Sequence, residues 1–115
     1  MTVTIYHNPR CSKSRATLAL IEERGLKPKI VDYLKTPPSA AELKAILRKL
    51  GLKPRDILRA GEPLYAELKL RTRDLGDDAL IALMVKHPIL IERPIVVASG
   101  KAALGRPPEN VLAIL

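Results

Sequence analysis

The residues with the clearest chemical potential lie in one short segment, His7-Asn8-Pro9-Arg10-Cys11-Ser12-Lys13-Ser14-Arg15. This segment contains the only cysteine of the chain. Basic side chains stand at positions 10, 13 and 15, and cationic neighbours favour the thiolate because they stabilise its negative charge. A lone cysteine is often just a small buried apolar residue. In this setting, however, Cys11 is a candidate nucleophile.

The spacing around Cys11 excludes two common cysteine chemistries. A Cys-x-x-Cys redox pair needs a second thiol at position 14, which is Ser14, so the protein does not close an internal disulfide. A phosphatase-like Cys-x5-Arg loop needs arginine at position 17, which is Thr17. We therefore expect a single reactive thiolate, an anion-binding turn and an external thiol that resolves any covalent adduct.

The neighbouring sequence predicts that Cys11 lies where a strand meets a helix. Residues 2–7 alternate between apolar and polar types, Asn8-Pro9 breaks this pattern, and a helical pattern runs from about Ser12 to Glu23 before Gly25. A cysteine at a helix N-terminus has its pKa lowered from about 8.5 to about 3.5–7.5. The free N–H groups of the first turn can also hold an anion against the sulfur.

His7 is the second candidate residue for catalysis. It ends the predicted strand, four residues before Cys11 in the sequence. It is either an exposed histidine at a strand end or a group that lowers the pKa of the thiol by charge or by a hydrogen bond.

The rest of the sequence predicts an α/β fold. Strands are expected over 27–34, 95–98 and 101–104, the last two joined by a tight turn at Ser99-Gly100. Helices are expected over 39–50, behind a Ser39–Glu42 capping box, over 55–60, over 78–86 with Asp77 as the cap, and over 109–115. Residues 64–70 are compatible with a helix.

These elements predict one thioredoxin-like domain over 1–115. A βαβ half, with parallel strands, and a ββα half would share a mixed parallel and antiparallel four-stranded sheet flanked by helices. A helical insertion of about 37–88 would separate the two halves.

Composition narrows the possible partners. The formal net charge is +8, but the 20 basic residues are dispersed and aromatic residues are scarce, which argues against nucleic-acid binding and leaves an anionic substrate or a solvated surface. No apolar run reaches the ~20 residues of a membrane span. A single cysteine fits a reducing cytoplasm. We expect a soluble monomer with no bound metal or cofactor.

The segment Asn8 to Arg15, followed by Leu18, resembles the active-site signature of the glutaredoxin-coupled arsenate reductase family. Other blocks are similar to the same family in the same order, so the resemblance spans nearly the whole chain: Ile57-Leu58-Arg59, residues 87–96 and Gly105-Arg106-Pro107. Ser12 departs from the pattern, since many members have glycine there.

The resemblance implies a thioredoxin-like fold and a reaction. Cys11 would attack arsenate, glutathione would add to give a mixed arsenic–thiol species, and glutaredoxin would supply the reducing step. Arg59, Arg93 and Arg106 would bind the oxyanion, which suits arginine because its forked guanidinium keeps its charge. Pro94 would be a cis-proline opposite Cys11. Asn8, Ser14 and Arg15 would support the site, which His7 would tune.

Two alternatives stay open. The first is a glutathione-dependent reductase of a different substrate, because the arginines do not distinguish arsenate from another substrate that glutathione can reduce. A non-catalytic regulatory module that binds RNA polymerase through its basic surface is the other, because the family includes such a branch. That branch has a Cys-x-x-Cys pair, which Ser14 removes here.

Overall fold

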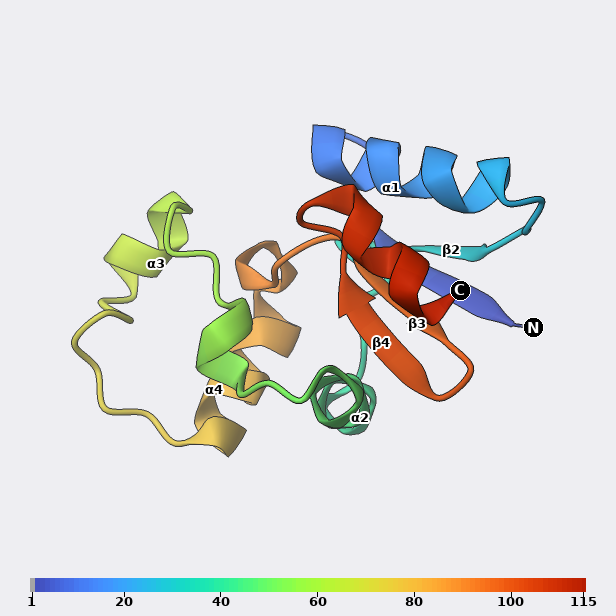
Figure 1. Ribbon diagram of the computed structural model, residues 1–115. Helices are drawn as coiled ribbons and strands as arrows, with labels where there is room; N and C mark the ends of the chain where they lie inside the picture. The colour runs from blue at the N-terminus through green and yellow to red at the C-terminus, as the bar shows by residue number, and fades with distance from the viewer. Residues whose placement is uncertain (1) are drawn as a thin grey trace. The chain divides into compact units, whose positions relative to one another are not determined.

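A computed structural model describes residues 2–115 and contains one four-stranded sheet with the strand order β2-β1-β3-β4 (Figure 1). The chain groups into two compact units. The first combines the chain up to Thr36 with Arg93–Leu115, and the second is Pro37–Glu92. The α/β class and the mixed sheet predicted from the sequence are confirmed. The prediction of a single domain stays a prediction.

The first unit begins with the predicted βαβ arrangement. Strand β1 (Val3–His7) leads into helix α1 (Ser12–Glu23), and β2 (Lys29–Asp32) pairs with β1 in parallel. Gly25 follows α1 with φ +76°, the left-handed conformation that glycine adopts without steric cost. Strand β2 is shorter than the predicted 27–34 because the backbone turns after Asp32, where Lys35 N–H donates to the Asp32 carbonyl at 3.0 Å.

The antiparallel part of the sheet also follows the prediction. Strand β3 (Ile95–Ala98) pairs with β1 on one side and with β4 (Lys101–Leu104) on the other, both antiparallel. Ser99 and Gly100 both have positive φ, as a two-residue hairpin turn of type I′ requires. The closing helix predicted over 109–115 is present as the 3-10 helix η3 (Pro108–Ile114).

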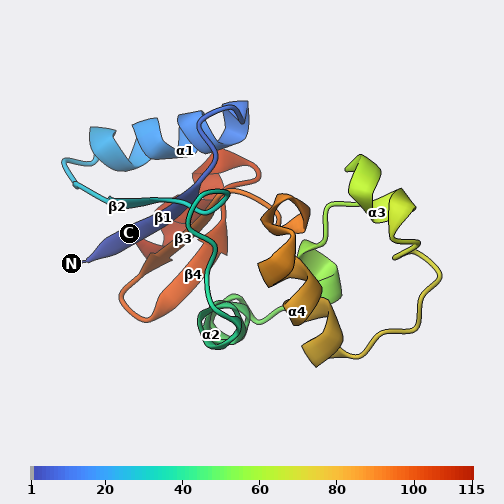
Figure 2. The same ribbon diagram turned by 180° about the vertical axis from the view of Figure 1, so that it is seen from behind.

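One face of the sheet carries the core of the first unit. The inward residues of β1 and β3 are buried with one residue each from α1 and η3, and this cluster comprises Val3, Ile5, Ile21, Val96, Ala98 and Val111. Both views show α1 running along this face (Figures 1 and 2). The period of two along the strands and the helical spacing on α1 thus place the apolar side chains on one shared surface.

The second unit is helical. It contains α2 (Ala40–Leu50), α3 (Pro63–Glu67), α4 (Asp77–Lys86) and the 3-10 turns η1 (Pro54–Ile57) and η2 (Pro88–Leu90). The predicted capping box is present, since Glu42 N–H donates to Ser39 Oγ at 3.1 Å while the Glu42 carboxylate accepts from Ser39 N–H.

Three details of this unit correct the sequence prediction. The helix expected over 55–60 is only the turn η1, because Leu58 leaves it to form a β-bridge with Ile91. Residues 64–70 are helical only as far as Glu67. Gly76, not Asp77, is the N-cap of α4, because its backbone is extended (φ −70°, ψ 168°) and Asp77 is already helical.

Gly105 lies where the end of β4 comes close to α1. A Cβ atom at Gly105 would stand 2.4 Å from Thr17 Oγ1 and 2.7 Å from Pro94 Cγ, both on buried residues. Thr17 Oγ1 in turn donates to the carbonyl of Lys13 at 2.8 Å. Only glycine fits this position, and the backbone that it allows leads directly into Arg106.

We therefore expect Gly105→Ala to destabilise the protein by about 1–3 kcal/mol, the usual cost of overpacking a filled site. The free energy of unfolding from urea titration checks this. Gly61→Ala is the matched control, because a Cβ there meets nothing within 4 Å; its effect should stay within about 0.5 kcal/mol. Equal stability of the two variants would contradict the close contact.

Candidate active site

Cys11 is the N-cap residue of α1. Its backbone is extended (φ −91°, ψ 123°), and its carbonyl accepts the first helical hydrogen bond from Arg15 N–H at 3.0 Å. Cys11 N–H closes a turn by donating to the Asn8 carbonyl at 3.0 Å, with Pro9 at the second position of the turn, which proline favours. No acidic residue stands in the first turn of α1, so nothing there neutralises the positive end of the helix dipole.

The buried hydroxyl of Ser14 ties this turn to the end of β1. Ser14 Oγ lies 2.6 Å from His7 Nδ1 and accepts a hydrogen bond from Asn8 N–H at 3.0 Å. Asn8 is buried as well, and its Oδ1 accepts from Arg10 N–H at 3.0 Å. The residue that replaces the second thiol of a Cys-x-x-Cys pair therefore binds both sides of the loop.

Arg15 holds the other side of the turn, where its Nη1 donates to the Pro9 carbonyl at 2.9 Å. Together with the contacts of Asn8 and Ser14, this places all three predicted supporting residues of the Cys11 loop in direct contact with it. Pro94 is buried in the same unit and follows a cis peptide bond, as predicted.

His7 is buried, and burial lowers its pKa below 6.5. The charge of Asp32 opposes this effect, while that of Arg15 adds to it. The imidazole is therefore neutral at physiological pH, and His7 is not the exposed strand-end histidine that was the other possibility.

The pKa of Cys11 is lowered. Burial raises it, but the backbone N–H of Ser14, the guanidinium of Arg93 and the backbone N–H of Lys13 together outweigh burial by stabilising the thiolate. This lowered pKa agrees with the prediction that a helix N-terminus and a cationic neighbour activate the thiol. The decisive cation is Arg93, which is distant in sequence, and not one of the adjacent basic residues.

Two of the predicted arginines meet at the sulfur. Arg106 Nη1 lies 4.0 Å from Cys11 Sγ and donates to the Arg93 carbonyl at 3.2 Å. Asn110 holds the backbone here, because its Nδ2 donates to the Arg106 carbonyl at 3.1 Å. Arg93 precedes β3 and Arg106 follows β4, so the hairpin brings both to one place.

Arg59 belongs to the second unit. Its guanidinium forms ion pairs with Glu62, where Nε and Oε1 are 3.3 Å apart, and with Glu92. The bridge between Leu58 and Ile91 fixes the backbone on either side, and Arg59 N–H donates to the Leu90 carbonyl at 2.8 Å. The prediction that Arg59 binds substrate stays a prediction.

Three residues of this region were not predicted from the sequence. Thr17 and Gly105 form the close contact described above, and Asp32 stands opposite His7 in the register of β1 and β2. Gly105 carried a signal, since it lies in a block similar to the family. Thr17 carries only the signal that it is not the arginine of a Cys-x5-Arg loop. Asp32 carries none, because strand pairing, which brings it opposite His7, is not visible in the local sequence.

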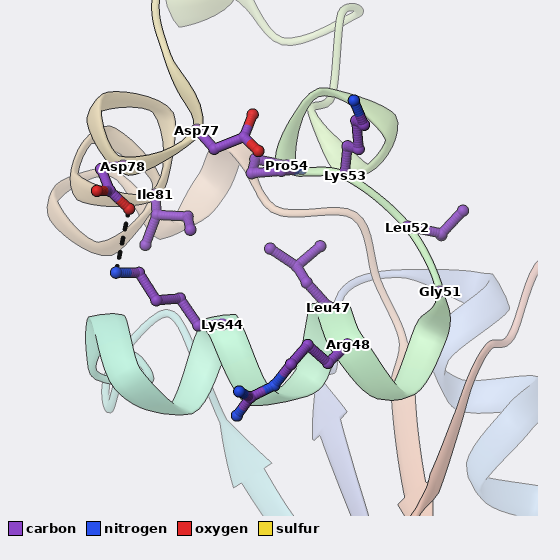
Figure 3. A pocket seen from close by; sticks show the side chains of 10 residues that line it. All are labelled: Lys44, Leu47, Arg48, Gly51, Leu52, Lys53, Pro54, Asp77, Asp78 and Ile81. Carbon is purple, nitrogen blue, oxygen red and sulfur yellow. Dashed lines mark ion pairs between the residues drawn. The ribbon is translucent and has the colours of Figure 1, made fainter.

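The described chain contains two pockets of interest. One of about 320 Å³ adjoins the Cys11 turn and is lined by Asn8, Pro9, Arg10, Asp32, Leu34 and Lys35. One of about 430 Å³ lies in the second unit between α2 and α4, where Leu47 and Ile81 form its apolar side and Lys44 pairs with Asp78 at 3.0 Å (Figure 3). No predicted site residue lines the second pocket.

Within residues 2–115, no group of three or more histidine, cysteine or carboxylate side chains is arranged to hold a metal ion. Over the same range, no helix combines the length and the apolar character needed to cross a membrane.

Comparison with known proteins agrees with this geometry. The ArsC family matches residues 6–114, so the chain belongs to the ArsC family. It is 54% identical, over 98% of its length and 97% of the relative's, to a protein named arsenate reductase from Neisseria meningitidis. It is 55% identical, over 98% and 96% of the two lengths, to an uncharacterized protein, YfgD, of Escherichia coli K12.

A solved structure described as an arsenate reductase from Vibrio cholerae has the same fold. It is 57% identical to this chain, covers 100% of it and 98% of its own length, and superimposes with a TM-score of 0.96. The thioredoxin-like fold predicted from the sequence is confirmed by this similarity.

The contacts of Cys11 predict how its alkylation depends on pH. The rate constant for iodoacetamide should rise with a midpoint below that of an ordinary cysteine thiol, because the pKa of Cys11 is lowered. In Arg93→Gln the midpoint should move upward, because the thiolate loses a cation and a donor. Arg10→Gln is the matched control and should keep the original midpoint, since Arg10 is exposed and its neighbour Cys11 is stabilised by other groups. A midpoint unchanged in Arg93→Gln would contradict the assignment.

The buried imidazole of His7 predicts a pH-dependent stability. Below pH 6.5 the unfolded chain takes up a proton at His7 while the folded chain does not, because its pKa is lower. The free energy of unfolding therefore falls as the pH drops below 6.5 and this loss ends at the folded-state pKa. Urea unfolding of the wild type and of His7→Gln at a series of pH values checks this. The variant should lose less stability over that window, and an equal loss in both would contradict it.

Proposed function

We propose that this chain is a thiol-dependent arsenate reductase. The observation that supports this most strongly is the pairing of a Cys11 thiol, whose pKa is lowered at the N-cap of α1, with the guanidinium groups of Arg93 and Arg106. The same chain is about half identical, over nearly its full length, to proteins named arsenate reductase.

In this proposal the Cys11 thiolate is the nucleophile. It forms a bond to arsenic while one arsenate oxygen leaves as water, and Arg93 and Arg106 hold the remaining charged oxygens. Guanidinium groups suit this task because their donors match a pair of oxyanion oxygens and their charge does not titrate. The free N–H groups at the start of α1 add further donors.

An external thiol completes the reaction, because the chain has one cysteine. The glutathione sulfur then bonds to arsenic, and a second arsenate oxygen leaves as water. A glutaredoxin thiolate attacks that sulfur and breaks its bond to arsenic, which leaves arsenic(III) on Cys11 and a mixed disulfide of glutaredoxin and glutathione. One water hydrolyses the Cys11–arsenic bond, which releases arsenite and restores the thiol. In total, arsenic(V) gains an electron pair and becomes arsenic(III), two thiols are oxidised to one disulfide, and one water is released. The enzyme needs no bound cofactor or metal ion for this sequence, and the expected location is the cytoplasm, where reduced glutathione is available.

The supporting residues act through the loop. His7 positions Ser14, whose hydroxyl and the carbonyl of Asn8 fix the turn that presents Cys11, and Arg15 restrains the same turn through Pro9. Pro94 packs beside Gly105, the residue that leads into Arg106. Arg59 is the third proposed oxyanion ligand, and only the similarity of its sequence block to the family supports this role. We also propose that the chain is a single domain and a monomer.

A coupled assay with arsenate, glutathione and glutaredoxin tests the proposal, with NADPH-linked reduction of the resulting glutathione disulfide as the readout. Wild type should turn over, and Cys11→Ser should lose activity by several orders of magnitude because no other thiol exists in the chain. The adjacent exposed Ser12→Ala serves as the matched control and should remain active. No turnover, or turnover that survives Cys11→Ser, would contradict the proposal.

Arginine variants refine the same assay. Arg93→Gln and Arg106→Gln should each lower kcat/KM for arsenate by about tenfold or more, as expected for a lost charge-assisted hydrogen bond. Arg24→Gln, at the far end of α1, should leave it unchanged. Arg59→Gln should lower kcat/KM for arsenate as the variants of Arg93 and Arg106 do. If it behaves as Arg24→Gln does, the part of the proposal that concerns Arg59 is wrong and the rest stands.

A further inference from the structure

The pocket beside the Cys11 turn lies at the carboxyl end of the two parallel strands. His7 ends β1 and stands opposite Asp32, which ends β2, and the pocket is formed by residues that directly follow both strands: Asn8, Pro9, Arg10, Leu34 and Lys35. In open α/β sheets, ligands bind at this edge, outside the carboxyl ends of parallel strands. The pocket therefore has the position of a ligand site, and it shares its wall with the turn that carries Cys11.

The strand order places this pocket and the arginines on opposite flanks of β1. Strand β2, with Asp32, pairs with one edge of β1, while β3 and then β4 continue from the other edge. Arg93 comes just before β3 and Arg106 just after β4, at the same end of the sheet, because Tyr6 pairs with Ile95 and Ile95 with Leu104. A molecule in the pocket would thus approach Cys11 from the side that the arginines leave open.

The charges of the pocket do not suit a simple anion. Asp32 contributes a carboxylate, and its Oδ1 atom is buried with no hydrogen-bond partner within residues 2–115. Arg10 and Lys35 are exposed at the rim and contribute cations. A carboxylate repels an oxyanion and needs a donor, whereas the two cations need acceptors. The complementary ligand carries an ammonium group and a carboxylate together.

In the larger pocket of the second unit, one pair of opposite charges is already joined within the protein. The Lys44 ammonium and the Asp78 carboxylate lie 3.0 Å apart, and Figure 3 marks this ion pair. Asp32 is different because its unsatisfied oxygen has a donor to gain.

We propose that the pocket lined by Asn8, Pro9, Arg10, Asp32, Leu34 and Lys35 binds the zwitterionic end of the thiol co-substrate. The ligand class is a peptide thiol with a free α-amino acid group, which describes glutathione. Its ammonium binds Asp32, its α-carboxylate binds Arg10 and Lys35, and its thiol extends along the turn toward Cys11. This inference rests on the proposed function, which supplies the need for an external thiol.

Direct binding tests the pocket without any catalysis. S-methylglutathione, which has no free thiol, is titrated into the Cys11→Ser protein, and backbone amide chemical shifts are followed by NMR. The largest shifts should fall on the amides of Asn8, Arg10 and residues 32–35. Asp32→Asn should weaken the affinity by about tenfold, the effect of one lost charge-assisted contact. Asp74→Asn is the matched control, since Asp74 is exposed and lies in the other unit, and should bind normally.

A second ligand separates the ammonium contact from a general effect of charge. N-acetyl-S-methylglutathione lacks the ammonium group and should bind more weakly than S-methylglutathione to the Cys11→Ser protein that retains Asp32. Adding Asp32→Asn should not reduce its affinity further, because the two changes remove the same contact. Lys35→Gln, on the exposed rim, should weaken both ligands, and Lys101→Gln should not. The comparison of Lys35→Gln with Lys101→Gln keeps the test valid if Asp32→Asn does not fold.

The outcomes separate this inference from the proposed function. If the ligand binds in a way that depends on Asp32 and Lys35 but the protein does not reduce arsenate, only the assignment of arsenate as the substrate is overturned. Arsenate reduction with shifts elsewhere, or with full affinity in Asp32→Asn and Lys35→Gln, would overturn the pocket. Weak shifts spread over many basic residues and insensitive to these variants would also overturn it.

Discussion

The hydroxyl of Ser14 is the contact on which the arrangement of the site depends. It is fully buried and bonds the imidazole of His7 and the backbone of Asn8, so it joins the first turn of α1 to the end of β1. A buried hydroxyl without partners would cost more than its bonds contribute, so these contacts hold the loop in one conformation. In that conformation Cys11 is the N-cap of α1, and the free N–H groups of the helix stabilise its thiolate.

The sheet places the charged residues that surround the Cys11 loop. Strand β1 lies between β2 and β3, and charged residues stand on both sides of its Cys11 end. Asp32 ends β2 on one flank, and on the other flank Arg93 precedes β3 and Arg106 follows β4. The close approach of Gly105 to Thr17 and Pro94 fixes the path of the chain into Arg106. Under the proposed function, this separation of charge across β1 would give an oxyanion and a zwitterionic thiol different places from which to reach one sulfur atom.

Local patterns predicted much of the fold. The bounds of α1 and the capping box at Ser39 follow from interactions within a few residues, which a sequence displays directly. The same holds for the Ser99-Gly100 turn. One error arose where a contact distant in sequence decided the outcome, because Leu58 pairs with Ile91 instead of extending a helix.

The sequence by itself determined that one thiol acts alone, because Cys11 has no second cysteine to pair with, and that the thiol stands at the start of a helix, because strand, turn and helix signals follow one another there. Only the tertiary structure decided which charges act on it. The basic residues next to Cys11 drew attention in the sequence, yet Arg93 and Arg106 are the ones that reach the sulfur. Electrostatic stabilisation depends on distance in space, and strand pairing sets that distance across dozens of residues of chain.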